Sequence, residues 1–373
     1  MNHIPFDIKL IICSYIMEPV YKMRDFIDPE RIRSMMEMNP SPGMIEILKN
    51  MDFSDILWEV LCRNTNPDAM KMIEYQLQTN YDNIKNRLDI EELCSNPNAI
   101  NIIKEHPDWI DMECLAMNHS PLAMDMMKEY LDNNDDPDVW YNLSKNPFAV
   151  DILFENMSKV HIPYLSQNPH PRVIDYLSVN PSYIDWYFLS AMPEAIDIIR
   201  KHIAEGGEKI VWKQLCRNPA AIDILEQNIL HSGGDMICWA SLSSNINGTQ
   251  LLRKYFKKDE DANLYTPIND SVYHINYEVF KNIKIHWPNL STNTSPDAMK
   301  LIEENPERLD KSAIRKIVID NYPSPNFYIE SVMTNHKIRH VVNMEALSQN
   351  PAIFIIDTKA TDIKIREFVS SLF

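Results

Sequence analysis

Two histidines have the spacing that comes closest to a metal site. His336 and His340 stand four residues apart on a segment expected to be helical, so both imidazoles would face the same side. No HExxH motif surrounds them, and no cysteine follows Cys238 that could complete a zinc set. We interpret the pair, flanked by Lys337 and Arg339, as part of a solvated basic face. No metal or other cofactor is expected.

The cysteines offer the next candidate chemistry, a thiol nucleophile. The chain has six cysteines and no CxxC pair, which is typical of free thiols in a reducing compartment. Cys62, Cys94 and Cys216 fall where corresponding segments carry serine, so we interpret them as small packing residues. The sequence has no GxSxG elbow, phosphate-binding loop, dinucleotide fingerprint or kinase motif set, and no isolated carboxylate pair stands out. The sequence therefore favours a protein that is not an enzyme.

Charge and hydropathy limit the partners that the chain is expected to bind. Its 373 residues carry a net charge of -17, which disfavours nucleic acid and anionic membranes and fits a basic or neutral protein partner. The apolar run at 8–17 is interrupted by Lys9 and is too short to cross a bilayer. We therefore expect a cytoplasmic protein, with neither a membrane nor a small molecule as partner.

An internal repeat accounts for the abundance of proline. The chain has 6 glycines against 24 prolines, which disfavours hairpin-rich and nucleotide-binding folds because both use glycine at positive φ. A phrase that reads Pro-x-Ala-Ile-Asp-Ile-Leu in its ideal form recurs along the chain. Its copies begin at Pro42, Pro67, Pro97, Pro121, Pro147, Pro171, Pro193, Pro219, Pro296, Pro325 and Pro351, with a degenerate copy at Ile246.

Each copy has the signals of a short helix followed by a longer one. Asn146 is a good N-cap, and Pro147 suits the first helical position, so a helix is expected to start there. Asparagine or serine precedes most anchor prolines: Asn66, Asn96, Asn146, Asn218, Asn350, Ser41, Ser120, Ser295 and Ser324. The loop between the two helices has a short form, as at 143–147, and a form two residues longer, as at 165–171. Apolar residues at helical spacing follow each anchor and predict a wide buried face.

Two such helices cannot bury their apolar faces alone, whereas stacked neighbours can. We predict an all-α fold, an α-solenoid of two-helix repeats of about 24–26 residues with helical caps at both ends. The predicted organisation is a helical leader at 1–35, regular repeats at 36–256, an irregular insertion or bend at 257–285, further repeats at 286–357 and a capping helix at 358–373. The last helix is expected to cover the open end of the array.

Most tryptophans share one repeat position, three residues before a leucine. The residues at this position are Trp58, Trp140, Trp186, Trp212, Trp239 and Trp287. Other units have isoleucine or methionine there, so the position requires bulk rather than an aromatic ring. We therefore predict core packing instead of a base-stacking platform.

Charged residues at repeated positions are the candidate binding groups. The second helices of five successive units carry an acidic ladder, a candidate surface for a Lys/Arg-rich partner: Asp125, Asp151, Asp175, Asp197 and Asp223. The alternative is an acid that favours the first turn of a helix. A candidate basic patch lies further along the chain: Arg253, Lys254, Lys257, Lys258, Lys311, Arg315 and Lys316.

The phrase Leu-Ser-x-Asn-Pro-x-Ala-Ile, as at 143–150 and 347–353, resembles the Asn-Pro repeat proteins of large DNA viruses of amoebae and algae, the giant viruses. The opening at 4–8, followed by Ser14-Tyr15-Ile16 and Tyr21-Lys22, is similar to the leader that often precedes these repeats. The resemblance covers most of residues 1–357, apart from 257–285. It implies a viral origin, hence the host cytoplasm or the virion, and a helical repeat fold. It implies no catalytic residues.

Several functions are consistent with these features. The first is a noncatalytic protein–protein interaction scaffold that binds a partner along its surface. The leader at 1–35 also resembles an F-box, which would make the chain a substrate receptor for a host ubiquitin ligase. A virion or assembly component and an RNA-binding or translation-assembly scaffold are further alternatives, the latter disfavoured by net acidity.

Overall fold

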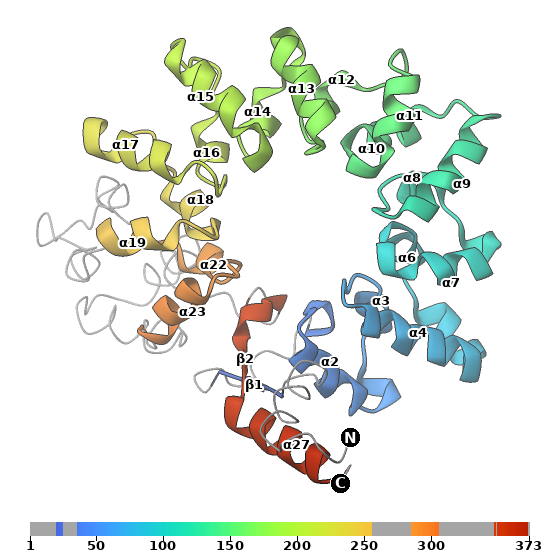
Figure 1. Ribbon diagram of the computed structural model, residues 1–373. Coiled ribbons are helices and arrows are strands. Elements are labelled where there is room, and N and C mark those ends of the chain that lie inside the picture. Colours follow the sequence, from blue (N-terminus) through green and yellow to red (C-terminus); the bar gives the residue numbers. More distant parts are fainter. Residues whose placement is uncertain (1–19, 25–35, 256–284, 306–346, 348, 372–373) are drawn as a thin grey trace, which may run out of the picture.

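The computed structural model describes residues 20–24, 36–255, 285–305, 347 and 349–371. In this part of the chain, short helices follow one another around a closed ring, each contacting its neighbours in the sequence (Figure 1). First helices such as α8, α10 and α18 lie on the inner side of the ring, and second helices such as α9, α15 and α17 lie on the outer side (Figure 1). The prediction of a helical fold with a repeated, proline-initiated pattern is confirmed.

The elements of the units alternate in chain order. The first elements of the units are η2 (Met36–Met38), α3 (Trp58–Leu61), α6 (Ile90–Ser95), α8 (Met112–Leu115), α10 (Pro137–Lys145), α12 (Ile162–Leu165), α14 (Trp186–Leu189), α16 (Trp212–Leu215), α18 (Trp239–Ser244) and α22 (Trp287–Leu290). The second helices are α2 (Pro42–Lys49), α4 (Pro67–Thr79), α7 (Ile100–Glu105), α9 (Pro121–Leu131), α11 (Val150–Glu155), α13 (Pro171–Val179), α15 (Ile196–Ala204), α17 (Ile222–Ser232), α19 (Thr249–Tyr255) and α23 (Pro296–Glu303).

Shorter elements connect these helices and end the chain. They are η3 (Phe53–Asp55), α5 (Tyr81–Ile84), η4 (Lys85–Arg87), η5 (Pro97–Ala99), η6 (Pro107–Trp109), η7 (Pro147–Ala149), η8 (Pro181–Tyr183), η9 (Pro193–Ala195) and η12 (Pro351–Ile353). Strands β1 (Tyr21–Met23) and β2 (Phe354–Ile356) and the last helix α27 (Thr358–Ser371) complete the described elements.

Polar caps start the second helices, as predicted. Asn146 Oδ1 accepts the N–H of Phe148 at 2.9 Å, and Pro147 takes the first position. The same kind of bond is made by every predicted cap that the structure describes: Asn66, Asn96, Asn146, Asn218, Asn350, Ser41, Ser120 and Ser295. Ser324 lies outside the described residues. In the Asn146 unit the first turn is a 3-10 turn, and α11 begins at Val150 rather than at Pro147 as predicted.

A row of buried asparagines joins all but one of the described units to the preceding one. Asn146 Nδ2 donates to the backbone carbonyls of Ala116 at 2.8 Å and Asn118 at 3.0 Å. The carbonyl of Asn146 in turn accepts from Asn168 at 2.9 Å. We call this row the asparagine ladder, and its members are Asn39, Asn64, Asn96, Asn118, Asn146, Asn168, Asn218, Asn245, Asn293 and Asn350. Because a buried carbonyl without a donor is costly, the ladder specifies how units stack.

A second row of hydrogen bonds runs beside the ladder. Ser144 Oγ donates to the Trp140 carbonyl at 2.7 Å and accepts the N–H of His161, at the start of the next unit, at 3.0 Å. Ser190 does the same for Val211. Cys216 Sγ accepts the N–H of Cys238 at 3.3 Å in the equivalent way. The side chain at this position therefore links a unit to the following one.

The two ends of the described chain meet and close the ring. Strands β1 and β2 pair antiparallel, with Lys22 opposite Ile355. Next to the sheet, Arg24 donates its backbone N–H to Ile353 O at 2.8 Å and its Nε to Ala352 O at 2.9 Å. The sequence did not indicate this short sheet. The first and last described parts of the array therefore lie side by side at this sheet (Figure 1).

Two long segments lie outside the described residues, at 256–284 and 306–346. They contain the predicted insertion at 257–285 except for Ile285, and the repeat expected at Pro325. The units on either side of the first segment contact each other directly, since His286 N donates to Ser243 Oγ at 2.9 Å. Likewise Asn350 donates to Asn293 O at 2.9 Å across the second. The ladder therefore continues past both segments.

Candidate interaction surface

The predicted acidic ladder lies on successive second helices and is exposed at each position. Arg172 pairs with Asp151 at 3.2 Å, and Arg200 makes two bonds to Asp223, at 2.7 and 3.1 Å. The Arg200 hydrogen bond holds the pKa of Asp223 below its usual value. Basic side chains of neighbouring units therefore already occupy two of the carboxylates. Several of these aspartates also stand in the first turn of their helices, as the structural alternative expects.

The structure describes only part of the predicted basic patch. Arg253 pairs with Glu304, and Lys254 Nζ lies 2.7 Å from Glu226 Oε1. The remaining members of the patch, Lys257, Lys258, Lys311, Arg315 and Lys316, lie outside the described residues. The same holds for the histidine pair at positions 336 and 340.

The tryptophan and cysteine positions belong to the core. Trp58 and Trp287 are 1% and 0% exposed, and the Nε1 of Trp58 donates to Phe53 O at 3.0 Å. Trp186, Trp212 and Trp239 are partly buried and pack against the same core.

Burial in the core also keeps two of the cysteine thiols protonated. Cys62 and Cys216 are fully buried, and burial raises the pKa of each thiol to about 12. A thiol that stays protonated at neutral pH is a poor nucleophile. The packing role that the sequence predicts fits both observations.

A cluster of aromatic side chains crosses the first helices of three units. Tyr141 of α10 contacts His161 and Tyr164 of the next unit, with ring centroids 4.6 and 5.8 Å apart. Tyr164 of α12 reaches Phe188 of α14 at 6.2 Å, and Phe188 contacts Tyr187 at 5.2 Å. Tyr141 and Tyr187 are 38% and 53% exposed. We call these five residues the aromatic cluster.

Sequence reasoning missed both the aromatic cluster and the asparagine ladder. The cluster combines three different positions within the unit, so a search for one repeated position does not find it. The ladder had a detectable signal, since an asparagine stands three residues after the core leucine whatever the loop length, as at Asn146 and Asn168. In units with the short loop, one asparagine both caps the following helix and donates to the preceding unit. The capping role alone explained these asparagines, so sequence reasoning did not look for a second role.

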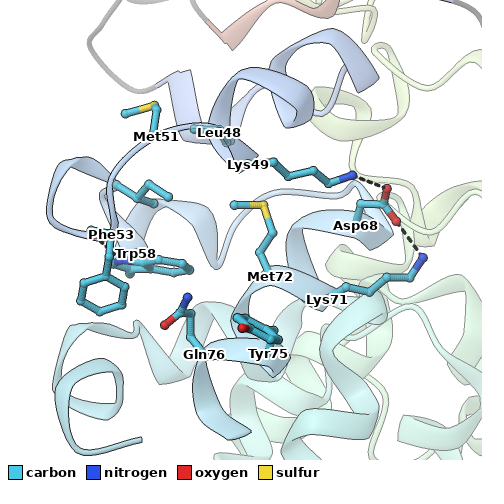
Figure 2. Close-up of a pocket in the computed structure, with 11 residues that line it drawn as sticks. Leu48, Lys49, Met51, Phe53, Trp58, Asp68, Lys71, Met72, Tyr75 and Gln76 are labelled. Carbon is cyan, nitrogen blue, oxygen red and sulfur yellow. Dashed lines mark hydrogen bonds and ion pairs between the residues drawn. The ribbon is translucent and has the colours of Figure 1, made fainter. Parts of the chain in front are cut away.

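A pocket of about 560 Å³ opens between α2 and α4. Its wall is apolar, with Trp58 and Met72 among the lining residues, and its mouth is charged (Figure 2). Asp68 lies between Lys49 at 3.2 Å and Lys71 at 2.7 Å, and these hydrogen bonds lower the pKa of its carboxyl. Because the charges at the mouth are paired with each other, the pocket suits an apolar side chain better than a charged ligand.

Other classes of site were sought across the described part of the chain. Within it, no three His, Cys, Asp or Glu side chains gather in a way that could hold a metal ion. None of its helices is long and apolar enough to span a membrane. No protein-family model, curated protein or solved structure matches this chain.

Proposed function

We propose that the chain is an α-solenoid closed on itself and serves as a noncatalytic protein–protein interaction scaffold of a giant virus. The side chains that recur from unit to unit support this proposal, because they are used for stacking. The amide of Asn146 and the hydroxyl of Ser144 both bond to backbone groups of other units. Recognition then falls to exposed side chains that differ between units.

The aromatic cluster is the observation that carries this proposal. Tyr187 leaves half of its surface in water although large aromatic side chains gain much from burial. Exposed tyrosines grouped on rigid helices are typical of the centres of protein interfaces. Serine hydrogen bonds join α10 to the α12 unit and the α12 unit to α14, so the helices that carry the cluster are held in place and the scaffold would lose little conformational freedom on binding.

Crosslinking mass spectrometry in infected cells tests the proposal. We expect crosslinks to a protein partner that concentrate around α10, α12 and α14, and their loss in the double variant Tyr141→Ser, Tyr187→Ser. Tyr81→Ser is the matched control, because Tyr81 is 40% exposed on α5 and belongs neither to the aromatic cluster nor to the pocket. Crosslinks that the double variant leaves unchanged would count against the cluster. Substrate turnover by the purified chain without any partner would refute the scaffold.

The position of the leader residues in the fold favours the scaffold over the ligase-receptor alternative. Tyr21 and Lys22 belong to the leader resemblance, and both lie in strand β1, paired with β2. This part of the leader therefore holds the ring together, whereas a docking F-box would have to leave it free. The virion-component alternative is decided by whether purified particles contain the chain.

A further inference from the structure

The first helices present one residue per unit on the side away from the core. It stands two positions before the core leucine, and it is exposed in six successive units. These residues form the inner row: Glu59, Glu91, Glu113, Tyr141, Pro163 and Tyr187. The following leucines, such as Leu143, are buried, so the row lies on the face opposite the core. The helices that carry it include α8 and α10, on the inner side of the ring (Figure 1).

One half of the inner row is acidic and lacks counterions. Among the described residues, no cation pairs with Glu59, Glu91 or Glu113, whereas arginines of neighbouring units pair with two members of the acidic ladder. Desolvation of its carboxyl and then the charges of Asp138, Asp111 and Asp136 raise the pKa of Glu113. This half therefore carries three carboxylates that make no ion pair with a cation of the described residues.

The other half of the inner row holds Tyr141, Pro163 and Tyr187, and both tyrosine rings are partly exposed to solvent. Elsewhere on the surface, Arg172 covers an aromatic ring, since it lies 4.1 Å from the Phe154 ring centre. Within the aromatic cluster, Lys145 lies 5.2 Å from the ring centre of Tyr164. In the described residues no cation covers Tyr141 or Tyr187. Both halves are contiguous, because Asn142, next to Tyr141, donates to Glu113 O at 2.9 Å. Lys213 occupies the next position and ends the row with a positive charge.

We propose that the inner row binds an extended, Lys/Arg-rich segment of a protein partner. In the acidic half, the carboxylates attract the basic side chains of the segment. In the other half, the tyrosine rings bind them by cation–π contact. Packed helices stand roughly 8–10 Å apart, and an extended polyproline II segment rises about 3.1 Å per residue with three residues per turn, so that every third side chain faces the same side. The segment is therefore expected to carry a basic residue at about every third position. This inference rests on the proposed scaffold function, which it makes more specific.

Titration of the full chain with labelled synthetic peptides of about 18 residues tests the inference. One peptide carries lysine or arginine at every third position, and a second has the same composition with the basic residues clustered at one end. Fluorescence anisotropy should show tighter binding of the periodic peptide, with affinity that falls as salt is raised. Equal binding of both peptides would overturn the proposed spacing.

Matched variants locate the binding surface. The triple variant Glu59→Gln, Glu91→Gln, Glu113→Gln should weaken binding about tenfold. The control Asp125→Asn, Asp175→Asn, Asp197→Asn removes the same charge from the acidic ladder and should change it less than about twofold. The double variant Tyr141→Ser, Tyr187→Ser reports on the aromatic half. A larger loss in the control than in the inner-row triple would overturn the proposal. If a partner is crosslinked in cells while the inner-row variants bind it normally, the scaffold function stands and this inference fails.

Discussion

The side-chain amide of Asn39 donates to the backbone carbonyl of Asn350 at 3.0 Å, although 311 residues separate the two. Asn39 is the first member of the asparagine ladder and Asn350 is the last. The bond therefore joins the ladder's ends, so that every unit of the described chain has a neighbour on both sides. A repeat array that ends in solvent must cover its terminal apolar faces with caps, whereas a ring covers them with its own units.

Opening the ring should enlarge the molecule without unfolding its helices. Arg24→Pro removes the N–H that bonds to Ile353 O and the side chain that bonds to Ala352 O. Small-angle scattering should show a larger radius of gyration, while circular dichroism keeps its helical signal. Arg63→Ala is the control, because the acids with which Arg63 pairs in the described residues belong to an adjacent unit and not to the sheet. An unchanged radius for Arg24→Pro would mean that the seam is dispensable.

Breaking one step of the asparagine ladder should cost more than an ordinary core change. Asn146→Leu leaves the carbonyls of Ala116 and Asn118 without their donor and removes the cap of Phe148, at about 2–5 kcal/mol. Met192 occupies the equivalent position one step beyond Asn168, so Met192→Leu should cost less than about 1.5 kcal/mol. Urea unfolding midpoints measure both. Similar costs for the two variants would show that the ladder bonds contribute little.

Replacing Met192 with asparagine should restore the missing hydrogen bonds of the asparagine ladder. Asn218 still bonds to Met192 O, but Met192 has no amide to donate to the unit before it. In Met192→Asn, two new hydrogen bonds of about 1 kcal/mol each should offset most of the lost apolar burial, leaving stability within about 1 kcal/mol of the wild type. The same change at buried Met127 of α9 gains no such bonds and should cost about 3 kcal/mol or more. Equal losses at the two sites, measured by thermal unfolding, would disprove the equivalence.

Stability should fall as pH rises because of one buried acid. Glu37 occupies the serine position of the first unit, where its Oε1 accepts the N–H of Leu57 at 3.1 Å. Burial raises the pKa of this carboxyl above 4.5, so the folded chain holds a proton that the unfolded chain has released. The unfolding free energy therefore declines between pH 4.5 and the raised pKa. Glu37→Gln should be more stable than the wild type at neutral pH and should lose this advantage at about pH 4.

Thermal unfolding midpoints between about pH 4 and pH 8 measure this difference. Glu155→Gln, at an exposed position of α11, serves as the control and should show no such trend. A Glu37→Gln advantage that stays constant across this range would assign the effect to packing rather than to ionisation.

The features that sequence reasoning found are those that depend on residues close together in the chain. A cap such as Asn146 bonds to an N–H two residues away, and the apolar face of a helix repeats within one or two turns. The helical fold, the repeat and the core role of Trp58 followed from such local patterns. The candidate acidic ladder came from the same reasoning, and its carboxylates lie at equivalent exposed positions.

Tertiary structure decided how the units meet. The aromatic cluster forms because the rings of Tyr141, Tyr164 and Phe188 come together only when three units stack. Each unit is rotated slightly relative to the one before it, and the ring closes only if these rotations add up to a full turn. No single unit encodes that total rotation. The sequence by itself therefore determined the unit and its caps. Only the folded chain decided that Asn39 would meet Asn350, because that contact is the outcome of all the packing between them.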